Sequence, residues 1–170
     1  IKAEAQELID NNIVPIPLSK NGTGKGCHIN DWQNKKFSAN KFSENNNIGM
    51  NLALSKKADV DGDSKEAVYF VPHFMSPTRK LGIQSPTGSM TVDAHYIYDE
   101  TVETNITREF SDGKTIAELR GNGNTVVAPS VAESKLFSKQ KCKRVWTNKK
   151  GFSKNPDLTK QFNKVCVASV

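Results

Sequence analysis

The chain has 170 residues, long enough for one ordinary domain with a hydrophobic core and short for two. No run approaches the roughly 18 apolar residues of a membrane helix, and the first residues lack a charged-then-apolar signal pattern, so we expect a soluble, cytoplasmic protein. Cys27, Cys142 and Cys166 are far apart and form no CxxC pair, which argues against a disulfide framework and a zinc site. Because the sequence begins at Ile1 rather than at methionine, we expect a fragment of a longer protein.

Positive charge is concentrated at the C-terminal end. Residues 131–170 hold 10 Lys and Arg against two acidic residues, whereas residues 1–130 hold 14 against 16. Aromatic residues are interleaved with these lysines, a mixture that nucleic-acid-binding surfaces use for phosphates and bases. A solvated lysine-rich surface is the alternative interpretation. The candidate nucleic-acid-binding residues are Lys141, Lys143, Arg144, Lys149 and Lys150.

The order of predicted elements favours an α+β fold with a mostly antiparallel sheet. Helices are predicted at 1–12, 64–75 (capped by Ser64) and 155–169. Strands are predicted at 13–18, 47–54, 57–61, 82–88, 91–99, 115–120, 125–130 and 143–147, with a Gly-rich loop at 19–32. We expect one domain over 1–170, made of an N-terminal α/β portion (1–50), a catalytic sheet (51–130) and a basic C-terminal segment (131–170).

The glycine-rich stretch NGTGKG, residues 21–26, invites comparison with a phosphate-binding P-loop. The P-loop pattern requires glycine where this chain has Ser19, and Ser or Thr where it has Gly26. We therefore expect an ordinary loop, from which Lys20 or Lys25 can contact a phosphate as a point charge.

Three aspartates stand close together in ADVDGD, residues 58–63. An EF-hand calcium loop is excluded, because its glycine and bidentate Glu positions hold Ser64 and Phe70. In a strand, Asp59 and Asp61 point to the same side, so both carboxylates can converge on a hard cation. We expect Asp63 to belong to the following turn and to serve as a control.

The same motif permits a second interpretation. DVDG matches the start of the D-x-D-G-T signature of haloacid-dehalogenase-like phosphatases, with Asp59 as nucleophile and Asp61 as acid. Asp63 stands where that signature has Thr, and no later acidic pair of the kind that binds magnesium in that family is present. The phosphatase is therefore the alternative.

Two further predicted strands carry acidic residues. Alternation in 91–99 places Asp93 and His95 on one face, and alternation in 115–120 places Glu118 beside Arg120. The opposite face of the first strand would carry Val92, Ala94, Tyr96 and Tyr98 as core residues. Either strand alone fits an amphipathic sheet edge. Together with the aspartate strand they indicate a two-metal nucleotidyl-transfer site.

Residues 3–150 resemble the prim-pol domain of the archaeo-eukaryotic primase superfamily, found in replication proteins of phages, plasmids and other mobile elements. The resemblance rests on NIGMNLAL, ADVDGD, SPTGSMTVDAHYIYD, IAELRGNGNTVVAPS and RVW, in this order. The family's D-x-D pair matches Asp59 and Asp61, its S-x-H histidine matches His95, and its third acid matches Glu118. Asp93 replaces the serine of S-x-H, and a single proline, Pro129, precedes Ser130.

The resemblance implies a DNA primase and DNA polymerase with an RRM-like, mostly antiparallel sheet. Asp59, Asp61 and Glu118 would hold two Mg²⁺ or Mn²⁺ ions, and His95 would contact the incoming (d)NTP. The resemblance also implies single-stranded DNA as the template and a helicase domain as a partner in the full-length protein. From strand alternation we add Arg120 as a phosphate contact. A non-catalytic module that binds single-stranded nucleic acid is a third interpretation.

Overall fold

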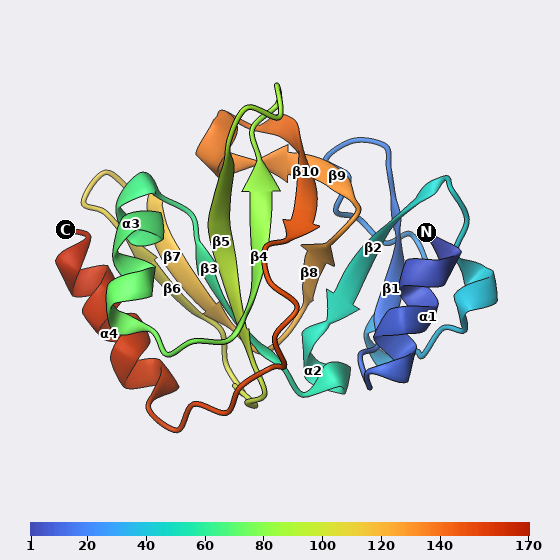
Figure 1. The fold of residues 1–170 in the computed structure, drawn as a ribbon, viewed down its shortest axis with the longest axis horizontal. Coiled ribbons are helices and arrows are strands. Elements are labelled where there is room, and N and C mark those ends of the chain that lie inside the picture. Colours follow the sequence, from blue (N-terminus) through green and yellow to red (C-terminus); the bar gives the residue numbers. More distant parts are fainter.

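Two β-sheets organise the structure, a computed structural model that describes residues 1–170 (Figure 1). The large sheet contains, in spatial order, β6 (Ile106–Glu109), β7 (Thr115–Arg120), β3 (Ala58–Gly62), β5 (Thr91–Tyr98), β4 (Arg79–Gln84), β10 (Gln140–Trp146) and β9 (Val131–Ser134). The small sheet contains β1 (Pro15–Ser19), β2 (Asn46–Asn51) and β8 (Asn124–Val127). All pairings within these sheets are antiparallel, which confirms the predicted α+β class.

Four α-helices accompany the sheets: α1 (Lys2–Asp10), α2 (Leu52–Ser55), α3 (Lys65–Phe74) and α4 (Leu158–Ala168). The predicted cap of α3 is confirmed, because the Ser64 hydroxyl accepts a hydrogen bond from the Ala67 amide at 3.1 Å. The strand predicted over 47–54 is wrong beyond Asn51. There the Asn51 side chain accepts a hydrogen bond from the Leu54 amide and starts the short helix α2.

Helices α3 and α4 cover one face of the large sheet (Figure 1). Alternate residues of β3, β5 and β7 point to these helices and form a core, and they include Ala58, Val60, Tyr96, Tyr98, Ala117 and Leu119. The expectation that Tyr96 and Tyr98 are core residues is therefore confirmed. The intervening residues of the same strands point to the opposite face, where the polar side chains lie.

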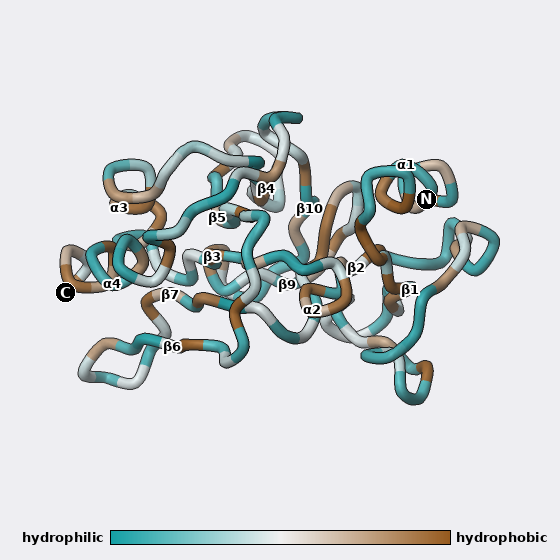
Figure 2. Tube along the Cα trace, turned by 90° about the horizontal axis from the view of Figure 1, so that it is seen from below, coloured by the Kyte–Doolittle hydropathy of each residue, from teal (hydrophilic) through white to brown (hydrophobic).

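The small sheet and α1 form the other end of the molecule. A second core joins Ala5 and Leu8 of α1 to Ile48 and Met50 of β2 and to Ile97 of the large sheet. The two termini consequently lie at opposite ends in both views, and the outer loops are mostly hydrophilic (Figures 1 and 2). None of the four helices has the length and apolar character that crossing a membrane requires.

The three expected portions of the chain are interleaved in space. Strand β8 belongs to the expected catalytic portion but pairs with β2 in the small sheet. Strands β9 and β10 belong to the basic segment and complete the edge of the large sheet next to β4. Residues from all three portions can therefore meet at one site.

Candidate functional site

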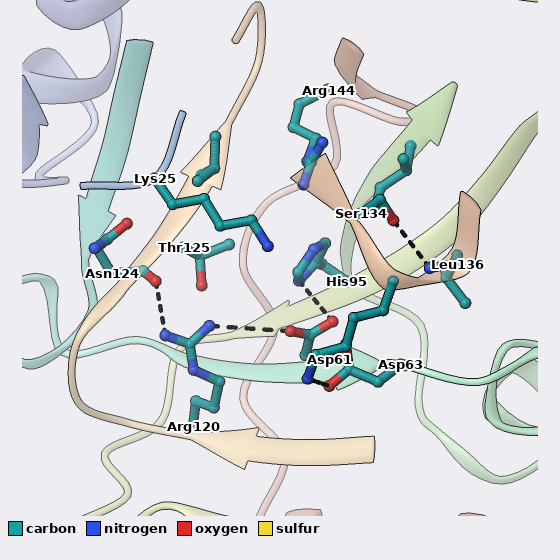
Figure 3. Close-up of a pocket in the computed structure, with 14 residues that line it drawn as sticks. Lys25, Asp61, Asp63, His95, Arg120, Asn124, Thr125, Ser134, Leu136 and Arg144 are labelled. Atoms are coloured by element: carbon teal, nitrogen blue, oxygen red, sulfur yellow. Dashed lines mark hydrogen bonds and ion pairs between the residues drawn. The ribbon is translucent and has the colours of Figure 1, made fainter. Parts of the chain in front are cut away.

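A polar pocket of about 230 Å³ lies where the face of the large sheet opposite α3 and α4 meets β8 and β9 (Figure 3). Its lining combines acidic and basic groups with few apolar ones. The lining residues are Lys25, Asp61, Gly62, Asp63, Ile83, His95, Arg120, Asn124, Thr125, Val126, Ser134, Lys135, Leu136 and Arg144.

Strand register explains why the acids meet here. Asp61 lies opposite Glu118 on β7 and opposite His95 on β5, while Asp59 lies opposite Arg120. Directly paired residues share one face of an antiparallel sheet. The predicted common face of Asp59 with Asp61, and of Glu118 with Arg120, is confirmed.

Asp59 is fully buried behind the pocket and does not line it. One carboxylate oxygen lies 2.9 Å from Nδ1 of His95 and also accepts a hydrogen bond from the Thr125 hydroxyl. Burial favours the neutral acid, but the charge and hydrogen bond of His95, with help from Arg120 and Thr125, hold the pKa of Asp59 below its usual value. Asp59 therefore remains a carboxylate whose main partner is His95.

His95 is held in its charged form by two carboxylates. Burial opposes the charge, yet Asp59 and Asp61 together raise the pKa of His95 above its ordinary value. Its Nδ1 atom lies 3.5 Å from Asp61 as well as 2.9 Å from Asp59. The imidazolium thus forms part of the back wall of the pocket, where it can attract an anion.

The negative charge of Asp61 is poorly compensated by the groups around it. Burial raises the pKa of Asp61 to about 7, and Asp63 and Asp59 add to this rise, while His95 and Arg120 oppose it. The closest atom of Arg120 is 3.9 Å away, beyond hydrogen-bond distance. A carboxylate in this setting gains stability from a bound cation.

Two groups of ligand atoms are close enough together to hold a metal ion. One group is Asp59, Asp61 and His95, and the other is Asp61, Asp63 and Glu118, with atoms within 4.8 Å of one another in each. The predicted ligand set of Asp59, Asp61 and Glu118 is therefore divided between two groups that share Asp61. Asp63 lies in the connection between β3 and α3, as expected, but its expected role as a control is wrong, because it belongs to the more accessible group.

Cationic side chains surround these acids (Figure 3). The Lys25 side chain extends from the glycine-rich loop toward the middle of the pocket, so the loop does bring a lysine to the site. Burial, together with the nearby charge of Arg144, lowers the pKa of Lys25. Arg120 donates a hydrogen bond of 2.7 Å to the Asn124 carbonyl, and Lys135 lies 3.4 Å from Asp63. These groups can bind the oxygens of a phosphate chain.

Arg144 differs from the other predicted nucleic-acid-binding residues, because only 3% of it is exposed. Its guanidinium donates to the carbonyls of Ala132, Cys142 and Glu133, and its Nε atom has no partner. Its assignment to an outer nucleic-acid surface is therefore wrong: it lines the pocket instead. The bonds to Ala132 and Glu133 join β10 to β9.

The four lysines of the same predicted group are exposed. Lys141 and Lys143 lie on β10 and alternate with Cys142 and Arg144, so they point to the side of the strand opposite to the pocket-lining Arg144. Lys149 and Lys150 follow β10, and Lys149 approaches Glu7 of α1 at 4.0 Å, on a different part of the surface. The predicted basic segment thus supplies two separate exposed pairs.

The expectation that Asp93 shares a face with His95 is wrong. Asp93 pairs with Gly82 of β4, and His95 pairs with the adjacent Leu81. The extra residue between Asp93 and His95 forms a β-bulge, which interrupts the alternation of the two faces. Asp93 instead lies 2.7 Å from Nζ of Lys80, which also approaches the Tyr96 ring on the helix-covered face. The difference from the S-x-H serine therefore lies outside the pocket.

Sequence reasoning assigned no role in the site to five polar residues of its lining: Asp63, Asn124, Thr125, Ser134 and Lys135. For Asp63 a signal was present, because a third acid two residues beyond a D-x-D pair can continue along the same face. Thr125 and Ser134 carried none, since their role depends on how the small sheet meets the large one.

A scan of the chain against protein-family models finds no match, and a search of curated proteins finds none either. Functional assignment therefore rests on the geometry of the site together with the motif resemblance described above.

Proposed function

We propose that the chain is a template-directed nucleotidyltransferase, a DNA primase and polymerase domain of the archaeo-eukaryotic type. The observation that carries the proposal is one pocket in which Asp61 and Asp63 stand opposite Lys25 and Arg144. Glu118 does not line the pocket but brings a third carboxylate close to the two aspartates. This arrangement matches a metal-bound triphosphate. The carboxylates on one side can hold the metal ions, and the cations on the other side can bind the phosphate oxygens.

The donor set fits Mg²⁺ or Mn²⁺. Carboxylate oxygens are the ligands that these hard cations prefer, and Asp61, Asp63 and Glu118 offer three. The raised pKa of Asp61 indicates that its negative charge is poorly compensated by the protein alone. When bound, such ions activate the attacking 3′-hydroxyl and stabilise the charge on the triphosphate and leaving pyrophosphate.

The protein's own groups complete the arrangement. Charged His95, oriented by Asp59 on one side, faces the pocket and can bind a phosphate oxygen. Lys25 and Arg144 add two further cations to the lining of the pocket. Arg120 lies beside Asp61, where it can share the charge of the same ligand.

The strand order supports the same proposal. Strands β7, β3, β5 and β4 are adjacent in this order, with α3 between β3 and β4 in the chain. This is the order of an RRM-like sheet, and α4 packs beside α3 in the place of its second helix. The phosphatase alternative receives no such support, because Asp59, its nucleophile, is buried and engaged by His95 and Thr125.

Extension of a labelled primer on a single-stranded DNA template, with Mn²⁺ or Mg²⁺ and nucleoside triphosphates, tests the proposal. We expect incorporation that Asp61→Ala abolishes and that Asp112→Ala, at an exposed acid in the β6–β7 turn, leaves intact. Release of phosphate without polymerisation would favour the phosphatase. Metal-independent DNA binding without turnover would favour the non-catalytic module.

A further inference from the structure

An apolar groove of about 590 Å³ runs beside the polar pocket, between α3, the start of β5 and the 3₁₀-helix Lys135–Phe137. Tyr69 and Met90 in this groove are 63% and 53% exposed. Val68, Val92, Leu136 and Phe137 complete its apolar lining. Exposed apolar surface of this kind usually marks a binding site.

Tyr69 is the only aromatic residue of the chain with a largely exposed side chain. Its hydroxyl makes no hydrogen bond within the chain, so nothing in the fold requires a tyrosine there. The centres of the neighbouring Phe70 and His73 rings lie 5.0 and 5.3 Å from its centre, and both rings support it from within α3. A supported, exposed ring is what an unpaired base stacks on.

The groove is continuous with the polar pocket. Leu136 lines both, so a ligand that extends from the acidic group has an apolar path across this residue. Lys135 precedes Leu136 and belongs to the pocket lining, whereas Lys65 lies one helical turn before Tyr69 and belongs to the groove lining. No acidic residue lines the groove.

We propose that this groove binds unpaired bases of single-stranded nucleic acid as the strand passes the polar pocket, with Tyr69 as the stacking residue. Lys65 and Lys135 would contact the phosphates on either side of the bases. This inference rests on the proposed function for the direction of the strand, but the binding itself requires no chemistry. A second copy of the chain or another protein is the competing occupant.

Fluorescence anisotropy tests the proposal, using a labelled oligo-dT strand of about 12 nucleotides in EDTA. We expect Tyr69→Ala to weaken binding by about tenfold and Tyr69→Phe, which keeps the ring, to bind as the native chain does. Val167→Ser removes an exposed apolar side chain from α4, outside the groove, and should change nothing. An abasic strand of equal length should bind native and Tyr69→Ala chains alike.

Equal affinity of Tyr69→Ala and native chains for oligo-dT would overturn the proposal. So would a dimer that Tyr69→Ala dissociates without effect on DNA binding, measured by light scattering. Because the titrations contain no divalent metal or nucleotide, their outcome is independent of primer extension. An inactive chain that shows the expected anisotropy pattern would refute the polymerase function and leave the groove assignment intact.

Discussion

Nδ1 of His95 lies 2.9 Å from a carboxylate oxygen of Asp59, and both side chains are buried between the two sheets. This pair separates the roles of the two aspartates in the D-x-D motif. Asp59 fixes the charge and orientation of His95, whereas Asp61 faces the pocket and contributes to both groups of metal-ligand atoms.

The first prediction concerns Asp59. Asp59→Asn removes the negative charge that balances a buried imidazolium, and we expect it to lower the free energy of unfolding by about 3 kcal/mol. Thr125→Val removes one hydrogen bond to the same carboxylate and should cost only about 1 kcal/mol. Urea denaturation followed by circular dichroism measures both. A chain with Asp59→Asn that is as stable as the native chain would show that the pair has no structural role.

Substitution of Asp61 should have the opposite effect on stability. The folded-state pKa of Asp61, about 7, lies above the ordinary value of 3.8, so its contribution to stability falls as the pH rises between these values and stays low above them. In EDTA above this range, Asp61→Asn should therefore stabilise the chain by roughly 1–3 kcal/mol. Thermal unfolding checks this, and Mn²⁺ should raise the melting temperature of the native chain only. A destabilised metal-free variant would contradict the account.

Asp63 provides the third prediction. Because Asp63 lies with Asp61 and Glu118, Asp63→Asn should weaken Mn²⁺ binding by about tenfold in isothermal titration calorimetry. Asp112→Asn is the matched control, since Asp112 is also an acid in a turn but pairs with Lys114 and belongs to neither group of ligand atoms. Unchanged affinity in the Asp63 variant would restrict the metal site to the buried group around Asp59.

Substitutions at two adjacent residues of β10, Lys143 and Arg144, should have different effects: one on DNA binding and the other on stability. Exposed Lys143→Ala should reduce the salt dependence of DNA binding, with a slope lower by about one, and leave unfolding unchanged. Buried Arg144→Ala should lower the free energy of unfolding by about 2–4 kcal/mol, because three carbonyls lose their donor. Anisotropy titrations at several salt concentrations and urea denaturation measure the two effects. Identical behaviour of the two variants would contradict this assignment.

Strand alternation predicted much of the site from the sequence. Asp61 and His95 meet because the period of two holds along β3 and in β5 beyond the bulge. The same rule failed for Asp93, because a bulge in the pairing of β4 with β5 shifts the register by one residue, and the alternating pattern of TVDAH does not reveal it. Asp93, a candidate ligand, consequently lies outside the pocket.

Burial could not be predicted in the same way. Asp59 and Asp61 are both aspartates and point to the same face of β3, yet only Asp59 is covered by Thr125 of β8. That contact joins the small sheet to the large sheet, and the sequence pattern of either strand does not reveal how the two sheets meet. Arg144 was misassigned for a related reason: composition identified its positive charge, but not the carbonyls of β9 that hold it inside.

The most direct test of the central claim is the anomalous scattering of Mn²⁺ in crystals grown with a non-hydrolysable nucleoside triphosphate. We expect Mn²⁺ density between Asp61, Asp63 and Glu118, with the triphosphate extending toward Lys25 and Arg144. Metal and nucleotide bound elsewhere, or nucleotide absent while Mn²⁺ occupies this group, would contradict the proposed nucleotidyl-transfer site.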